Sequence, residues 1–319
     1  MEPQAPISSQ ASEASAFRNT IRQEMQRLGM SQSRLSKESG INAARLSQWL
    51  ACKYTGNNEV IEQELSRWLA TQHEREKNTT RFSLVTEWRP TPTGNSITSA
   101  LRYAQDAGDI SLIYGGAGVG KTCTARRYQE DNSNVWIATI TPTINSVAAC
   151  MERIGVAVKL PEVPARAVKA ENAIINQITG SNGLLIVDEA QHLPVNSLEA
   201  LRGLHDASGC GLALMGNESV YARITGGSRQ ASFAQLFSRV GFRLRLEKPS
   251  SNDVETLISA WGVAEKKARR LCLEIASRAG ALRGLVKVLR LASTMLMDGD
   301  EALTVDHIQT AWADQDGNI

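Results

Sequence analysis

A glycine-rich run that ends in lysine and threonine is the part of the sequence with the clearest chemical meaning. Residues 115–122 read Gly-Gly-Ala-Gly-Val-Gly-Lys-Thr and directly follow the apolar stretch 110–114. Glycines let the backbone curl until successive N–H groups point at one centre, and a helix that begins there adds its positive end. The spacing G-x-x-x-x-G-K-[ST] between a strand and a helix is that of a phosphate-binding loop. We therefore expect a nucleoside triphosphate to bind here.

Each polar group of this loop has an expected role. Lys121 should reach the β- and γ-phosphates, and the Thr122 hydroxyl should bind the Mg²⁺ that accompanies ATP. Cys123 follows directly, and we expect its side chain to pack in the helix rather than to do redox chemistry. The expected ATP-binding set is Gly115, Gly116, Ala117, Gly118, Val119, Gly120, Lys121, Thr122 and Cys123.

A pair of carboxylates follows the apolar run 184–187. Asp188 and Glu189 stand where this buried strand should end. Asp188 is expected to hold Mg²⁺, and Glu189 to orient or deprotonate the attacking water. His192 is a less favoured candidate for the base, because a carboxylate already fills that role.

Three further side chains complete the candidate catalytic set. Asn217 follows the apolar run 212–215 and is placed to bridge the attacking water and the γ-phosphate, although an Asn there also starts turns. Arg239 precedes the last apolar run, and Arg283 lies in the C-terminal helical region. An ATPase that hydrolyses ATP at subunit interfaces needs two such arginines, one from the neighbouring subunit and one from its own lid. The candidate catalytic residues are Lys121, Glu189, Asn217, Arg239 and Arg283.

Alternating apolar runs and helical stretches over residues 97–248 must position these groups. The runs are 110–114, 135–140, 184–187, 212–215 and 241–246. Apolar strands separated by helices predict a parallel five-stranded sheet covered on both faces, which is an α/β domain. After Pro249 the pattern is helical throughout, which predicts a C-terminal helical lid over 249–319.

The region before the expected sheet divides into three parts. Residues 1–16 are rich in Ser, Ala, Gln and Pro, which predicts a flexible tail. Residues 17–70 show short helical patterns separated by glycine-containing turns, which predicts an all-α helix-turn-helix domain. Residues 71–96 are polar and then proline-rich, which predicts a linker.

Composition limits the class of protein. The 319 residues are 42% hydrophobic and 21% charged, which excludes wholesale disorder and fibrous repeats. Lys and Arg number 35 against 33 Asp and Glu, and this net charge of +2 is too even for coating nucleic acid through bulk charge. No stretch approaches the roughly 18 apolar residues of a membrane helix, and no secretory signal is visible. The five scattered cysteines indicate neither disulfides nor zinc, so we expect a reduced, cytoplasmic protein with no membrane partner.

The order of these motifs resembles that of AAA+ ATPases. More narrowly, the chain resembles the MuB family of phage transposition proteins, which are ATP-dependent activators of target DNA. The segments that carry this resemblance are 54–59, 134–137 with 139–142, 188–190 with 192–193, 214–217, 225–227, 236–239 and 280–283. The resemblance covers residues 17–314. The phosphate-binding loop is common to many ATPases, whereas Thr-Gly-Gly at 225–227 together with Leu-Phe-Ser-Arg at 236–239 is more specific.

The resemblance implies a protein that binds ATP and assembles as a helical filament on double-stranded DNA with little sequence preference. It implies delivery of that DNA to a DNA transposase, which would be stimulated and would in turn stimulate ATP hydrolysis. Release from DNA near the element's own ends would give target immunity. By position, Asn217 would be the γ-phosphate sensor, Arg239 the interface finger and Arg283 the lid sensor. The expected setting is the cytoplasm of a bacterium or of a phage-infected host.

Two sets of side chains are candidates for DNA contacts. The third expected helix of the N-terminal domain carries polar groups suited to phosphates or base edges. Polar segments of the α/β domain carry basic residues, although this chain is less basic there than the family pattern. The candidates are Asn42, Arg45, Gln48, Lys159, Arg166, Lys169 and Arg229. Because the net charge is small, we expect a filament to multiply a few phosphate contacts per subunit.

Two other functions fit the same motifs. One is a transcription regulator whose helix-turn-helix reads a specific operator under the control of ATP. A preference for selected over random DNA above ~10³ would favour it. The other is a helicase- or clamp-loading ATPase that forms a closed ring on a protein partner. Electron microscopy with ATP and long DNA distinguishes filaments from rings.

Overall fold

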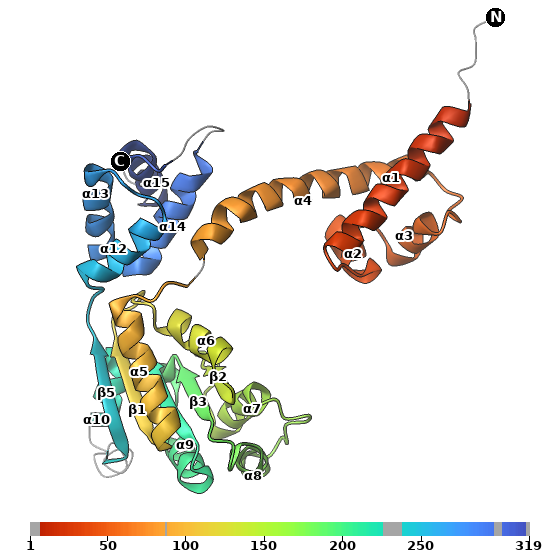
Figure 1. Ribbon diagram of the computed structural model, residues 1–319. Coiled ribbons are helices and arrows are strands. Elements are labelled where there is room, and N and C mark those ends of the chain that lie inside the picture. The colour runs from red at the N-terminus through yellow and green to blue at the C-terminus, as the bar shows by residue number, and fades with distance from the viewer. Residues whose placement is uncertain (1–6, 87, 226–237, 297–301, 317–319) are drawn as a thin grey trace, which may run out of the picture. The chain divides into compact units, whose positions relative to one another are not determined.

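The computed structural model describes residues 7–86, 88–225, 238–296 and 302–316 (Figure 1). The chain forms two compact units, Met1–Leu84 and Val85–Ile319. Within the described residues, no helix combines the length and apolarity that crossing a membrane requires.

The first unit is all helical. Its helices are α1 (Ile7–Arg27), α2 (Gln32–Ser39), α3 (Ala43–Leu50) and α4 (Asn58–Thr86). Short polar side chains start the second and third helices, since Ser31 accepts the N–H of Arg34 and Asn42 accepts the N–H of Ala44. Apolar side chains from all four helices form one core, which includes Ile21, Leu35, Leu46, Trp49, Ile61 and Leu65. The predicted helix-turn-helix arrangement of α2 and α3 is present.

Two helix boundaries in this region differ from the sequence predictions. Helix α1 begins at Ile7, inside the segment 1–16 that is predicted to be a flexible tail. Helix α4 continues to Thr86, and α5 (Pro92–Ala107) begins soon after, so most of the predicted linker 71–96 is helical. No Gly or Pro occurs from residue 58 to residue 89, and a polar composition without these breakers is compatible with a solvated helix.

The second unit contains a parallel five-stranded sheet, as predicted. Its strands are β1 (Ile110–Gly115), β2 (Val135–Thr139), β3 (Leu184–Asp188), β4 (Gly211–Gly216) and β5 (Val240–Leu246). They pair in the order β2-β3-β4-β1-β5, and every pairing is parallel. All their carboxyl ends therefore lie at one edge of the sheet, which is where ligands bind in such sheets.

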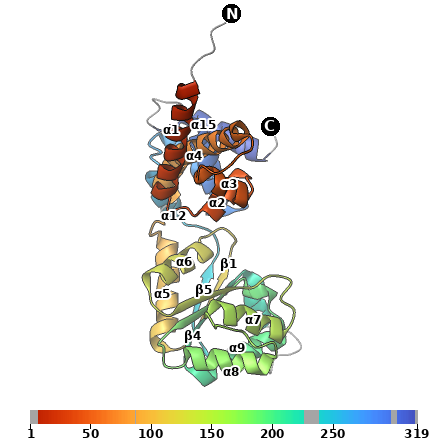
Figure 2. The same ribbon diagram turned by 90° about the vertical axis from the view of Figure 1, so that its right-hand side faces the viewer.

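Helices cover both faces of the sheet (Figures 1 and 2). On one face α5 and α6 (Lys121–Asp131) pack against Ile113, Ile186 and Met215. On the other face lie α7 (Val147–Ala157), α8 (Ala167–Ile178), α9 (Val195–Ser208) and α10 (Glu218–Thr225), which pack against Leu112, Val187 and Leu214. Neighbouring residues of a strand point to opposite faces, so β1, β3 and β4 are apolar on both.

A helical lid follows β5. Its helices are α12 (Ser251–Ala260), α13 (Lys266–Ser277), α14 (Ala281–Thr294) and α15 (Val305–Asp316), and they share their own apolar core. Asp253 joins the lid to the sheet domain, because its fully buried carboxylate accepts the backbone N–H of Thr93 at 2.8 Å and the Thr93 hydroxyl at 2.6 Å. The same carboxylate accepts the N–H and hydroxyl of Ser250 and so caps α12.

Candidate nucleotide site

The phosphate-binding loop connects β1 to α6 at the carboxyl edge of the sheet. Gly118 has a φ of 78°, and an added Cβ at that position would overlap the carbonyl oxygen of Gly280. The loop therefore requires glycine there for two reasons, its left-handed backbone and the close approach of the lid. A cavity of about 290 Å³ opens beside the loop and is lined by Ala117, Lys248 and Gly280. The lid and the phosphate-binding loop thus border one concave site.

Lys121 is folded onto its own loop. Its Nζ donates to the carbonyl oxygens of Gly115 at 3.0 Å and Gly116 at 2.7 Å. Burial lowers the pKa of the Lys121 ammonium, and the nearby carboxylates of Asp188 and Glu189 act in the opposite direction. A triphosphate offers this partly desolvated cation anionic acceptors, which form stronger hydrogen bonds than neutral carbonyl oxygens do.

Thr122 and Asp188 meet directly. The Thr122 hydroxyl donates to Asp188 Oδ2 at 2.7 Å, and the carboxylate is only 2% exposed. Burial raises the pKa of Asp188, which the hydrogen bond from Thr122 partly offsets. A hydroxyl and a carboxylate are hard oxygen ligands of the kind that Mg²⁺ prefers, so these two residues fit the expected metal. Cys123, by contrast, is exposed, so the expectation that it packs within the helix is wrong.

Glu189 follows the strand in a left-handed conformation, with φ 57° and ψ 37°. Its backbone N–H donates to Asp188 Oδ1 at 3.0 Å, and its carboxylate accepts a hydrogen bond from the Gln191 side chain. The carbonyl oxygen of the same Gln191 amide accepts the backbone N–H of Asn217 at 3.3 Å. Gln191 is not among the site residues predicted from the sequence. The only signal for it was a polar amide two residues beyond the expected catalytic carboxylate.

Asn217 lies at the end of β4, beside the strand that leads into the phosphate-binding loop. Its Oδ1 accepts the backbone N–H of Ser219 at 2.9 Å and the Ser219 hydroxyl at 2.7 Å. These bonds start α10, so the turn-forming role that the sequence left open is present. They also fix the direction of the amide, whose nitrogen is then the end suited to donate to a γ-phosphate.

The two candidate arginines lie in different places. An added Cβ at Gly118 would contact Arg283 Cβ, and the Arg283 charge contributes to lowering the pKa of Lys121, so Arg283 stands beside the phosphate-binding loop. Arg239 directly precedes β5, whose first residue, Val240, pairs with Ile110 at the start of β1. Arg239 therefore lies at the amino edge of the sheet, about 20 Å along the strands from the loop of its own chain. There it forms an ion pair with Asp206 at 2.6 Å.

The candidate DNA contacts fall into two described groups. Asn42 uses its side-chain oxygen to cap α3, and Arg45 donates to the Tyr54 hydroxyl at 3.2 Å, while Gln48 is exposed. Lys159, Arg166 and Lys169 are all exposed and lie on the connection between α7 and α8 or in the first turn of α8. Arg229 lies outside the described residues.

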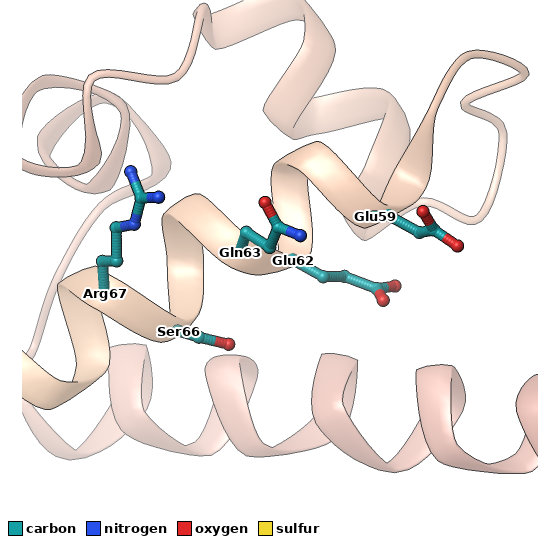
Figure 3. Close-up of a pocket in the computed structure, with 5 residues that line it drawn as sticks. All are labelled: Glu59, Glu62, Gln63, Ser66 and Arg67. Carbon is teal, nitrogen blue, oxygen red and sulfur yellow. The ribbon is translucent and has the colours of Figure 1, made fainter.

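A separate depression runs along α4 in the first unit (Figure 3). It is lined by Glu59, Glu62, Gln63, Ser66 and Arg67. All five come from successive turns of one helix, and they include two carboxylates, which repel phosphates. Arg67 is the single basic group among these five residues, and the lining contains no glycine-rich loop, so it lacks the arrangement that binds a triphosphate.

The sheet order, a phosphate-binding loop after β1, an Asp-Glu pair after β3 and a helical lid together define the AAA+ class of P-loop proteins. Residues 104–224 match the family model of the AAA domain. Residues 238–315 match the model described as Mu B transposition protein, C terminal.

Comparison with known proteins identifies the family within the AAA+ class to which the chain belongs. The chain is 35% identical over 285 residues to the ATP-dependent target DNA activator B of Escherichia phage Mu, which covers 89% of this chain and 90% of that protein. It is 32% identical over 271 residues to the Mu-like prophage FluMu DNA transposition protein B of Haemophilus influenzae, covering 84% of this chain and 93% of that protein. The chain therefore belongs to the MuB family of target DNA activators.

A solved structure supports the fold. A chain of Drosophila ORC bound to DNA aligns with a TM-score of 0.50 at 16% sequence identity, over 74% of this chain and 64% of that chain. At this identity the likeness shows the AAA+ type of fold alone.

Proposed function

We propose that this protein is an ATPase that assembles in its ATP-bound form as a filament on double-stranded DNA and presents that DNA as target to a DNA transposase. The observation that carries the proposal is the division of the catalytic set between two edges of one sheet. Lys121, Thr122, Asp188 and Glu189 lie at the carboxyl edge, and Arg239 lies at the amino edge. Membership of the MuB family supports the role in target DNA activation and the cytoplasmic setting.

In the proposed hydrolysis, Glu189 orients a water molecule and accepts its proton as the water oxygen attacks the γ-phosphorus. The bond from that phosphorus to the oxygen shared with the β-phosphate breaks, which gives ADP and inorganic phosphate. Lys121 binds the β- and γ-phosphates, and Asn217 donates to the γ-phosphate. Mg²⁺ held by Thr122 and Asp188 would offset the charge of these phosphates.

The interface finger explains why ATP would control assembly. Because Arg239 is remote from the phosphate-binding loop of its own chain, we propose that it contacts the γ-phosphate bound to a neighbouring subunit. A head-to-tail contact of this kind builds a filament when the rotation between subunits does not close a ring. Hydrolysis removes the shared anion, so it weakens the contact and releases subunits.

DNA would be held by many weak contacts. Each phosphate contact releases counterions, and a filament repeats the contacts of one subunit along the duplex. The exposed residues Lys159, Arg166 and Lys169 follow one another in the sequence from the connection after α7 into the first turn of α8, which supports them as the repeated contacts. The helix α3 side chains Arg45 and Gln48 are proposed as auxiliary contacts to DNA or to the transposase. Arg229 stays a prediction from the sequence.

Substitution at the phosphate-binding loop tests this function. We expect Lys121→Ala to abolish ATP binding and DNA binding together, because assembly needs the bound triphosphate. Glu189→Gln should keep ATP binding and give longer-lived filaments, because only hydrolysis is lost. The measurements are binding of a fluorescent ATP analogue and electron microscopy of each protein on long duplex DNA with ATP or ADP. Normal coating of DNA by the Lys121→Ala protein would contradict the proposal.

The same experiment separates the alternatives. Closed rings on a protein partner would favour a loading ATPase. Binding to one selected sequence more than ~10³-fold above random duplex would favour an operator-reading regulator.

A further inference from the structure

Gln191 connects two parts of the nucleotide site that come from neighbouring strands. It lies in the short 3-10 turn Ala190–His192 that follows β3. One end of its side-chain amide donates to the Glu189 carboxylate, and the other end accepts the backbone N–H of Asn217 at 3.3 Å. We propose that Gln191 is a positioning residue for ATP hydrolysis, which holds the Glu189 carboxylate in register with the end of β4. This inference rests on the proposed ATPase function.

The contact of Gln191 with β4 depends on the absence of a side chain at Gly216, the last residue of that strand. A Cβ at Gly216 would overlap Gln191 Oε1 and would approach the Gln191 backbone nitrogen within 3.4 Å. The missing side chain at Gly216 therefore leaves the space that the Gln191 amide fills. The side chain is partly buried, so its hydrogen bonds to Glu189 and Asn217 are formed where competition from water is reduced.

Glu189 needs such a support. A left-handed conformation is uncommon for a residue other than glycine, and it turns the chain sharply at the point where the catalytic carboxylate begins. Its backbone is held by Asp188, while Gln191 holds one oxygen of its side chain. A carboxylate fixed through one oxygen presents the other in a defined direction. That is the requirement for a group that must orient a water molecule.

The same amide relates Glu189 to the sensor position. The Asn217 side chain is the proposed donor to the γ-phosphate, and its own backbone N–H is the donor to Gln191. A displacement of the end of β4 when the γ-phosphate is bound or lost is therefore passed through Gln191 to Glu189. Gln191 in this way links recognition of the γ-phosphate to orientation of the water.

Two substitutions at Gln191 distinguish the effect of its hydrogen bonds on ATP hydrolysis from the effect of its side-chain volume. Gln191→Met keeps the size of the side chain and removes the hydrogen bonds to Glu189 and Asn217, together with the 3.5 Å contact to the His192 ring. Gln191→Glu keeps an acceptor for the N–H of Asn217 but replaces the donor to Glu189 with a repelling carboxylate. We expect both to lower kcat for ATP hydrolysis about ten- to a hundredfold. The KM and the Kd for a fluorescent ATP analogue should change less than about threefold, because the phosphate-binding loop is intact.

Gln105→Met is the matched control. The Gln105 amide donates to the carbonyl oxygens of Ser133 and Asn182. Ser133 lies just before β2 and Asn182 just before β3, so these contacts are at the amino edge of the sheet. This substitution also removes a structural amide, and it should leave kcat within about twofold of the unsubstituted protein. Thermal unfolding of each variant reports whether folding is retained.

A double substitution supplies the decisive outcome. If Gln191 acts through Glu189, adding Gln191→Met to Glu189→Gln should lower the single-turnover rate by less than about twofold. Full, multiplicative loss in the double variant would overturn the inference, as would unchanged kcat in both Gln191 variants. Equal loss of ATP affinity and kcat would also overturn it and would leave Gln191 a merely structural residue. Absence of ATP hydrolysis by the unsubstituted protein is a different result, which would refute the proposed function itself.

Discussion

The two edges of the parallel sheet are built in different ways. At the carboxyl edge the carboxylates of Asp188 and Asp253 are 2% and 0% exposed, and each accepts hydrogen bonds from neighbouring elements. At the amino edge Asp206 and Arg239 form an ion pair in which the side chains are 33% and 38% exposed. Removing one member of a buried polar network leaves other buried groups without partners, whereas an exposed ion pair exchanges partners at little cost. The difference suits a fixed nucleotide site at one edge and an exchangeable contact for a neighbouring subunit at the other.

The largest expected effect tests whether the two edges cooperate between subunits. Arg239→Ala should lower the DNA-stimulated kcat by about 10³-fold or more, the range known for an arginine finger in nucleotide hydrolases. Binding of a fluorescent ATP analogue to the isolated subunit should not change, because Arg239 is remote from its own phosphate-binding loop. Steady-state phosphate release and equilibrium binding measure the two quantities.

Mixing two inactive proteins gives the control. A Lys121→Ala subunit lacks its nucleotide but carries Arg239, and an Arg239→Ala subunit has the opposite defect. A mixture should recover part of the ATPase activity if the finger acts between subunits. Two inactive proteins that stay inactive together would contradict that arrangement and would leave Arg239 with a role inside its own chain.

The sequence predicted those features of the carboxyl edge that are encoded by residues adjacent in the chain. The loop 115–122 is one continuous motif, and the apolar strands that flank it are visible as runs. Gln191 and Asp253 were not predicted, because their partners Asn217 and Thr93 lie 26 and 160 residues away in the chain. Only the fold brings these distant pairs together, and neighbouring residues predict at most the local contacts, such as the cap that Ser250 and Asp253 form on α12.

The boundaries of α1 and α4 were missed for a different reason. Residues 71–86 of α4 are mostly polar, and a polar segment reads equally as a linker or as a solvated helix. A contact of Gln72 stabilises the helical form, because its buried amide donates a hydrogen bond to Glu38 at 2.9 Å in the first unit. That contact, too, joins residues distant in sequence.

The second prediction concerns the buried carboxylate at the carboxyl edge. Asp253→Asn should lower the free energy of unfolding by about 1–3 kcal/mol, because an amide nitrogen cannot accept from the N–H of Ser250. Burial tends to raise the pKa of Asp253, but the hydrogen bonds from Thr93 and Ser250 outweigh it and hold the pKa below the ordinary value of 3.8. A lowered pKa contributes stability that is present above that value and is lost as the pH falls through the folded-state pKa.

The difference between Asp253→Asn and the unsubstituted protein should therefore shrink in acid. Urea unfolding at pH 7 and at about pH 3 measures it. A difference that stays constant over this range would show that the charge of Asp253 does not contribute, and that only its shape matters.

The smallest expected effect belongs to the exposed carboxylate. Asp206→Ala should change the free energy of unfolding by less than about 1 kcal/mol, because exposed ion pairs contribute little. Since Asp206 competes with a neighbouring γ-phosphate for Arg239, its removal should raise the ATPase rate at low protein concentration by about twofold, and added salt should abolish the gain. Asp131→Ala is the control for loss of an exposed carboxylate, because it removes an ion pair to Arg127 at 2.8 Å within α6, as Asp206→Ala removes one to Arg202 at 3.0 Å within α9 besides the pair with Arg239. A large loss of activity in Asp206→Ala but not in Asp131→Ala would reverse the interpretation. The ion pair would then hold Arg239 in its working position, and the amino edge would be as fixed in function as the carboxyl edge.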